Sequence, residues 1–203
     1  MAKVIQFPSP NPDPEKFGFK PVRKKKHTDT PPPKEGQLNL FVGGKVVSMN
    51  QLSTFEEALM LDEQGNEKAK EIYAKAIKQG DSVADAYCNL GILESEQKNY
   101  TKAIDCFTRG LKEDPRHFEA HYNLANLYAE VGNLPLAKLH YQMSIEIEPT
   151  FPNSHFNLGL TLAMNKEIDE AVQSLLTYRN LVTYEEEKSQ VEELISNLTR
   201  TIR

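Results

Sequence analysis

The sequence repeats with a period of 34 residues, and this limits the possible folds more than any other feature of the chain. Residues 84–117 align with residues 118–151 and then with residues 152–183. The aligned positions hold Tyr87, His121 and His155; Leu90, Leu124 and Leu158; Gly91, Ala125 and Gly159; Ala103, Ala137 and Ala171; and Phe107, Tyr141 and Leu175. A fixed period of this length is typical of proteins in which each repeat buries its apolar face against its neighbours.

Each repeat predicts two helices joined by a polar turn. Apolar residues recur at intervals of three and four, as they do in a helix with one buried face. The turns fall at 98–99, 132–133 and 166–167. Pro115 and Pro149 end the first two repeats, because proline cannot continue a helix interior, while the third repeat has Thr183 at this position. We therefore expect an all-α fold.

These residues resemble the tetratricopeptide repeat (TPR) family, whose pattern is matched by Tyr87-Cys-Asn-Leu90-Gly91, Ala103, Phe107, Pro115 and their counterparts. The resemblance implies a right-handed solenoid of about four helix-turn-helix repeats within residues 49–203. The repeats are expected at about 50–83, in degenerate form, and at 84–117, 118–151 and 152–183. Residues 184–203 carry an apolar stripe that includes Val191 and Leu198, so we expect a capping helix over the last repeat.

The first 48 residues have a different composition from the rest of the chain. They carry nine Lys/Arg and four Asp/Glu, which gives a net charge of +5. Residues 49–203 carry fifteen Lys/Arg and twenty-five Asp/Glu, which gives a net charge of −10. Eight of the twelve prolines also lie in this segment, and its apolar residues show no helical period. We therefore expect a basic, proline-rich tail at 1–48, with residues 1–36 disordered.

The tail contains two short motifs. Gln37, Leu38, Asn39, Leu40 and Phe41 resemble the pentapeptide with which bacterial replication and repair proteins bind the DNA sliding clamp. The same region also reads as a hairpin over 37–48, with Gly43-Gly44 as its turn. The basic run Arg23–Lys26 could contact nucleic acid, dock on the acidic array of its own chain, or simply remain a solvated charge cluster.

In the TPR family, the first helices of the repeats line a concave groove that binds peptide segments of other proteins. Asn89, Asn123 and Asn157 recur at the 34-residue step on these helices, and the first-helix pattern predicts that they form a column along one face. An amide both donates and accepts hydrogen bonds, so such a column could pair with a peptide backbone. The alternative is that these asparagines follow the family consensus and bind nothing.

Other residues on the predicted groove face are aromatic, polar or acidic. They are Tyr122, Phe156, Asn126, Glu119 and Glu130. We expect the acidic residues to favour a neutral or basic peptide. Relatives that bind a C-terminal carboxylate need lysines and an arginine here, whereas this chain has Cys88, Asp85, Glu119 and Asn123 at those positions. The groove is therefore not expected to be a carboxylate clamp.

The sequence contains no phosphate-binding loop, nucleophile elbow or zinc-pair spacing. His117 and His121 have a metal-compatible spacing but are interpreted as structural, and Cys88 and Cys106 as reduced, packed thiols. No apolar stretch is long enough for a signal or a membrane helix, so a cytoplasmic location is expected. We therefore predict a non-enzymatic scaffold or adaptor without cofactor or metal. The alternative is a clamp-tethered adaptor in bacterial DNA replication or repair.

Overall fold

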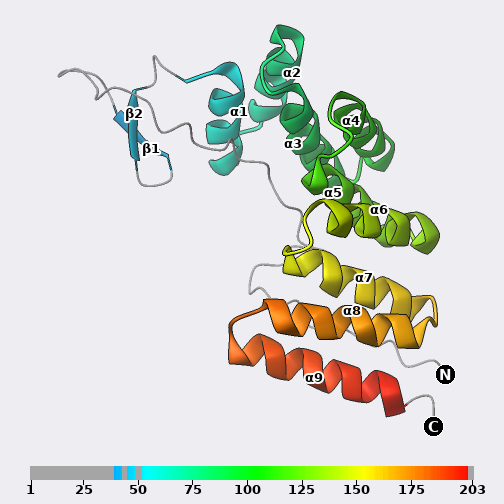
Figure 1. Cartoon of the computed structure of the whole chain (residues 1–203). Helices are drawn as coiled ribbons and strands as arrows, with labels where there is room; N and C mark the ends of the chain where they lie inside the picture. The colour runs from blue at the N-terminus through cyan, green and yellow to red at the C-terminus, as the bar shows by residue number, and fades with distance from the viewer. Residues whose placement is uncertain (1–38, 43–44, 49–51, 201–203) are drawn as a thin grey trace. The chain divides into compact units, whose positions relative to one another are not determined.

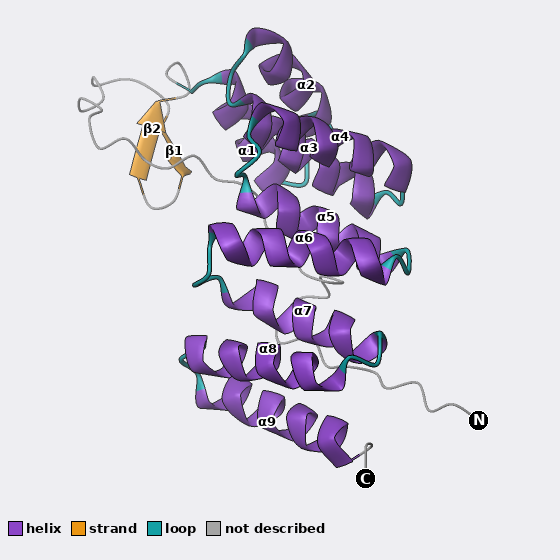
Figure 2. Cartoon of the chain, turned by 45° about the vertical axis from the view of Figure 1, so that its right-hand side comes forward, coloured by secondary structure: helices purple, strands orange, loops and turns teal. Residues whose placement is uncertain are grey.

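The computed structural model describes residues 39–42, 45–48 and 52–200. The elements are β1 (Asn39–Val42), β2 (Lys45–Ser48), α1 (Thr54–Glu63), α2 (Ala69–Gln79), α3 (Val83–Glu96), α4 (Tyr100–Glu113), α5 (Phe118–Glu130), α6 (Leu134–Ile147), α7 (Pro152–Met164), α8 (Ile168–Leu181) and α9 (Glu185–Arg200). Successive helices pack as the antiparallel pairs α1/α2, α3/α4, α5/α6 and α7/α8 (Figures 1 and 2). The predicted all-α repeat fold is confirmed.

The helices form two compact units that meet at Pro115 and Arg116 in the sequence. The first unit contains α1–α4 and the second contains α5–α9. The split falls between the first two well-matched repeats, although the 34-residue period runs through it without a break.

The two strands lie in the tail. β1 pairs with β2 in antiparallel register, with Leu40 opposite Val47 and Phe41 opposite Val46. The pentapeptide 37–41, for which clamp binding stays a prediction, begins outside the described residues and continues into β1. The predictions for residues 1–36, including the basic run Arg23–Lys26, also fall outside the described residues.

The first unit shows how the sequence defines a helix start. Ser53 precedes α1 and its hydroxyl accepts a hydrogen bond from the backbone N–H of Glu56, at 3.3 Å. The Glu56 carboxylate accepts one from the backbone N–H of Ser53 in return, at 2.8 Å, so the two residues form a capping box. The core of this unit contains Phe55, Ala58, Ala69, Tyr73, Ala76 and Ala86.

The small residue after the aligned leucine allows the two helices of a repeat to approach closely. A Cβ atom on Gly91 would lie 2.8 Å from the Phe107 ring, and one on Gly159 would lie 2.7 Å from Cγ of Leu175. Real Cβ atoms do not approach other heavy atoms this closely. Glycine at these two positions therefore lets Phe107 and Leu175, on the second helices, pack directly against the backbone of the first helices.

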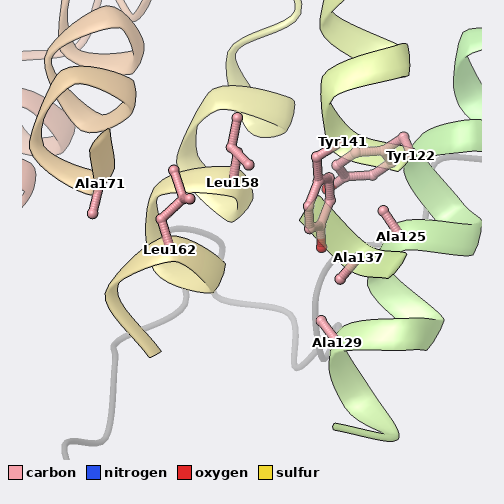
Figure 3. Close-up of a cluster of buried hydrophobic side chains, with 8 residues drawn as sticks. All are labelled: Tyr122, Ala125, Ala129, Ala137, Tyr141, Leu158, Leu162 and Ala171. Carbon is pink, nitrogen blue, oxygen red and sulfur yellow. The ribbon is translucent and has the colours of Figure 1, made fainter. Parts of the chain in front are cut away.

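The second unit has one core between α5, α6, α7 and α8, shown in Figure 3. Its buried members are Tyr122, Ala125, Ala129, Ala137, Tyr141, Leu158, Leu162 and Ala171. A separate cluster joins α8 to α9, where Leu175 and Tyr178 pack with Val191 and Leu198. The last helix thus covers an apolar face of α8, which would otherwise be exposed to water.

Candidate functional site

The structure places all four candidate asparagines in the interior. Their side chains are between 0 and 7% exposed: Asn89, Asn123, Asn126 and Asn157. Asn89 belongs to the first unit and the other three belong to the second. The sequence led us to expect amides presented on an open face, whereas Asn89, Asn126 and Asn157 bond to the hydroxyl groups of buried tyrosines, which need polar partners.

In the second unit, Asn126 lies at the centre of a hydrogen-bond network that joins three helices. Its Oδ1 atom accepts from the Tyr141 hydroxyl at 2.6 Å and from Nδ2 of Asn157 at 3.0 Å. Nδ2 of Asn157 also donates to the Tyr122 hydroxyl, at 3.1 Å. Burial raises the pKa of Tyr141 well above its ordinary value, so this hydroxyl keeps its proton and remains a donor.

The other end of the Asn126 amide has a different environment. Among the described residues, its Nδ2 atom is one of two buried side-chain polar atoms that have no hydrogen-bond partner. A buried donor without an acceptor costs about 1–3 kcal/mol. A carbonyl oxygen that accepted a hydrogen bond from this Nδ2 atom would remove that cost and stabilise the fold.

The first unit contains a related network. Nδ2 of Asn89, on α3, donates to the Tyr73 hydroxyl on α2 at 3.1 Å. The Tyr73 hydroxyl in turn donates to Oδ2 of Asp62, on α1, at 3.0 Å. Burial raises the pKa of Tyr73 and also that of Asp62. Each unit thus uses an asparagine of a first helix to satisfy a buried tyrosine.

One face of α5 carries most of the remaining candidates. Glu119, Tyr122, Asn126 and Glu130 follow one another at spacings of three, four and four residues, so they form a single stripe along the helix, here called the α5 stripe. The two glutamates are partly buried, and Tyr122 is 1% exposed. Every residue from Ala120 to Leu127 is buried, so α5 is covered on all sides over more than two turns.

The two aromatic candidates take part in packing. The Tyr122 ring lies edge-on to Phe151 with their centroids 5.1 Å apart, and it lies beside Tyr141 in Figure 3. Phe156 is partly buried, and its ring centroid is 4.9 Å from that of Tyr178. Both residues therefore stabilise the helix pairs, whether or not a ligand contacts them.

The histidines have structural contacts. His117 precedes α5 and accepts a hydrogen bond from the backbone N–H of Ala120 through Nδ1, at 3.2 Å, which caps the helix. Nδ1 of His121 lies 3.0 Å from Nδ1 of His140, and the His140 ring stacks on Tyr128. Burial, and then the neighbouring His121, lower the pKa of His140 to about 4.

The depressed pKa of His140 predicts a pH-dependent stability. An unfolded histidine binds a proton near pH 6.5, whereas the folded His140 remains neutral down to about pH 4. The protein should therefore keep its full stability above pH 6.5 and lose about 1–2 kcal/mol between pH 7 and pH 5 from this residue alone. Urea unfolding of the protein and of His140→Phe at both pH values measures this loss. An equal loss in the variant would contradict the assignment.

The described residues offer little catalytic chemistry. They contain no group of three or more His, Cys, Asp or Glu side chains placed to hold a metal ion. Burial raises the pKa of the Cys106 thiol to about 11, and a thiol that keeps its proton is a poor nucleophile. No helix among the described residues has the length and apolar character needed to span a bilayer.

Sequence comparison matches residues 84–117 and 118–151 to one tetratricopeptide repeat model and residues 140–173 to a second. These are the segments whose helix pairs, glycine contacts and 34-residue step are described above. The chain is a TPR protein. No curated protein is similar enough in sequence to count as a match.

Several solved structures share the fold of this TPR protein. MamA from Desulfovibrio magneticus RS-1 is 14% identical, with a TM-score of 0.58, over 72% of this chain and 92% of that one. The type III secretion translocator chaperone SycD of Yersinia enterocolitica is 16% identical, with a TM-score of 0.55, over 59% and 85%. The first TPR domain of Spaghetti (RPAP3), solved with the HSP90 peptide SRMEEVD, is 18% identical, with a TM-score of 0.54, over 59% and 92%.

Charge in this TPR protein is divided between the two helices of each pair. The first helices, α1, α3, α5 and α7, contain nine carboxylates and no lysine or arginine. The second helices, α2, α4, α6 and α8, contain eight Lys/Arg and six carboxylates. Seven of the nine first-helix carboxylates lie in the first unit, on α1 and α3, while the other two lie on α5 and α7 has none.

The second unit also contains an open hollow of about 620 Å³ on its second-helix side. Leu158, Leu162 and Ile168 contribute apolar lining, and Lys138 and Gln142 lie among its polar residues. The hollow is lined mainly by α8 and includes no residue of α5. It is therefore distinct from the α5 stripe.

Proposed function

We propose that this TPR protein is a non-enzymatic interaction module that binds an extended, neutral or basic peptide segment along its first helices. The candidate residues are Asn89 in the first unit and Asn123, Asn126, Asn157, Tyr122, Phe156, Glu119 and Glu130 in the second. Of these, Phe156, Glu119 and Glu130 are partly exposed and available for direct contact, and the others support the first helices from within. The absence of lysine and arginine from all four first helices is the observation that carries it. A peptide with positive charge would be attracted to such a surface, and an acidic peptide would be repelled.

A contrast within the fold supports this choice of ligand. The first TPR domain of RPAP3 was solved with a peptide that ends in two glutamates, a valine and an aspartate. An acidic ligand of that kind needs cationic partners, and the first helices of this chain supply none. The peptide proposed here is therefore neutral or basic, whereas the peptide in that complex is acidic.

The proposed ligand-binding residues differ in how well they can be tested. Alanine at Asn126 or Asn157 would break the buried tyrosine network and destabilise the fold, which would obscure any effect on binding. Glu119 and Glu130 lie at the two ends of the α5 stripe and only partly in the interior. Charge reversal at these two residues is the cleaner test.

We expect Glu119→Lys combined with Glu130→Lys to weaken the capture of basic peptides about tenfold or more, because two attractive contacts become repulsive. The full chain would be titrated into an array of extended peptides of graded charge, at low and high salt. Glu146→Lys is the matched control, since Glu146 is exposed on the second helix α6. Equal capture by all three proteins, each with wild-type helicity, would reject the first-helix surface.

A further inference from the structure

The hollow on the second-helix side of the second unit is a feature that the proposed function does not use. It follows the first two turns of α8, and Lys138 and Gln142 of α6 and Thr199 of α9 also contribute to its lining. All of these helices belong to the second unit. Its volume of about 620 Å³ lies within the range of about 300–1,000 Å³ that is typical of binding sites. The hollow is therefore large enough to receive side chains of a ligand.

Four aliphatic side chains give the hollow an apolar lining. Leu158 and Leu162 lie one turn apart on α7 and belong to the core of the second unit (Figure 3). Ile168 and Val172 lie one turn apart on α8 and are partly buried. Part of the edge of the core is thus open at this point, and an apolar ligand that covered it would remove that area from water.

The charged residues of the hollow give it a net negative charge. Asp169 and Glu170, in the first turn of α8, are exposed. Lys138 is the only cationic residue among the described residues that line the hollow, and its Nζ atom already donates to the carboxylate of Glu167. No other cation in the lining balances the charges of Asp169 and Glu170. A ligand that carried positive charge beside its apolar side chains would complement this surface.

The contact between α8 and α9 shows how α8 receives a helix. The apolar residues of α8 pack there with Val191 and Leu198 of α9. An ion pair accompanies this contact, with Nε of Arg179, on α8, 2.5 Å from Oε1 of Glu192, on α9. Apolar side chains and a complementary charge thus join these two helices. The hollow offers the same combination on α8, with negative charge in place of positive charge.

We propose that the hollow is a second docking site, which receives two apolar side chains from a basic amphipathic helix of a partner protein. The lining residues of α8 run from 168 to 174, which is about 9 Å along the helix. Side chains four residues apart on one face of a helix are separated by about 5–6 Å, so a leucine pair at this spacing fits within that length. An open hollow covers only one side of its ligand, which suits a helix with one apolar face better than a small molecule that needs enclosure. Because this site is separate from the first-helix surface, one chain would bind two partners at once.

The test uses the full chain and three fluorescent helical peptides that share one alanine-rich sequence. The leucine–lysine peptide carries two leucines four residues apart, flanked by lysines. The second peptide has glutamates in place of the lysines, and the third has serines in place of the leucines. We expect the leucine–lysine peptide to bind at least about tenfold more tightly than either of the others, because each of them lacks one of the two features that the hollow complements. Its binding should shift the backbone amide resonances of Val172 and Gln173.

Two variants of the chain test the location of this binding. Gln142→Lys combined with Gln173→Lys places two cations at exposed positions of the lining and should weaken the binding of the leucine–lysine peptide about tenfold or more. Asp169→Asn combined with Glu170→Gln removes the two exposed carboxylates and should weaken the binding about fivefold.

The matched control replaces Glu185 and Glu186 by glutamine. Both are exposed carboxylates in the first turn of α9 and lie outside the lining, so this variant should bind the peptide as the unmodified chain does. Equal binding of the three peptides, no binding at about 1 mM peptide, or unchanged binding by the Gln142→Lys, Gln173→Lys variant overturns the inference. Self-association of the unmodified chain that is lost in that variant overturns it as well, because the hollow would then be an interface between two copies.

Failure of this inference is distinguishable from failure of the proposed function. Glu119→Lys combined with Glu130→Lys alters the first helices and should leave the binding of the leucine–lysine peptide unchanged. If these substitutions abolish it, the peptide binds the first-helix surface, and the hollow is rejected while the proposed function stands. If extended basic peptides do not bind but the helical peptide binds at the hollow, the proposed function is rejected and the second docking site stands.

Discussion

Replacing Tyr141 by alanine is expected to lower the free energy of unfolding by about 3–5 kcal/mol, the range found when a large buried aromatic side chain is truncated. Tyr141 is 0% exposed and lies in the core of the second unit, beside Tyr122 and Ala137 (Figure 3). Its hydroxyl also donates to Oδ1 of Asn126 at 2.6 Å. The substitution therefore creates a cavity and removes a buried hydrogen bond together.

Two further variants separate these contributions in urea unfolding experiments. Tyr141→Phe keeps the ring and removes only the hydroxyl, so a loss of about 1–2 kcal/mol is expected, because Asn126 still accepts from Asn157. Tyr184→Ala truncates a tyrosine that is 72% exposed and should change the stability by less than about 0.5 kcal/mol. A Tyr141→Ala variant as stable as Tyr184→Ala would show that this core is not what holds the second unit together.

The sequence pattern was sufficient for the helix pairs and for the contacts between them. The step of 34 residues aligns Phe107, Tyr141 and Leu175, and the structure buries all three completely. Gly91 and Gly159 align at the same step, and a Cβ atom at either position would clash with the second helix. Such features depend on local periodicity, which a single sequence displays directly.

The environment of the candidate site was less accessible to sequence reasoning. Asn89 and Asn157 lie at equivalent repeat positions, but their hydrogen-bond partners do not. The partner of Asn89 is Tyr73 on the second helix α2, whereas the partner of Asn157 is Tyr122 on the first helix α5. Periodicity identifies which residues share a face and does not identify what packs on that face. The tyrosines gave a usable signal, because a buried hydroxyl requires a polar partner. Asp62 and Asn89 supply the partners of Tyr73, and Asn157 supplies one for Tyr122.

The division into two units also has no counterpart in the repeat pattern. Residues 84–117 and 118–151 match the same repeat model, yet the helices separate into compact units at Pro115 and Arg116. A repeat consensus records the residues that form each helix pair. How strongly one pair packs on the next depends on the particular side chains at each junction, which the consensus leaves open.

The close contact at Gly159 provides a second large effect. Alanine in a helix is ordinarily about 1 kcal/mol more favourable than glycine, so Gly159→Ala would be stabilising in an isolated helix. Here the new Cβ atom would lie 2.7 Å from Cγ of Leu175 and 3.2 Å from the backbone oxygen of Ala171. We expect a net destabilisation of about 2 kcal/mol, measured by urea unfolding, because α7 and α8 must move apart.

A double-mutant cycle tests whether Leu175 is the cause. Leu175→Ala alone should cost about 2–5 kcal/mol, because this residue is 0% exposed. In the double variant the alanine at 159 has room, so the combined cost should fall short of the sum by about 1–2 kcal/mol. Gly132→Ala serves as the control: its φ of +81° makes the change unfavourable, but a Cβ there would meet nothing within 4 Å. The cost of Gly132→Ala should therefore add to that of Leu175→Ala. If the costs of Gly159→Ala and Leu175→Ala were also additive, the destabilisation by Gly159→Ala would not come from its contact with Leu175.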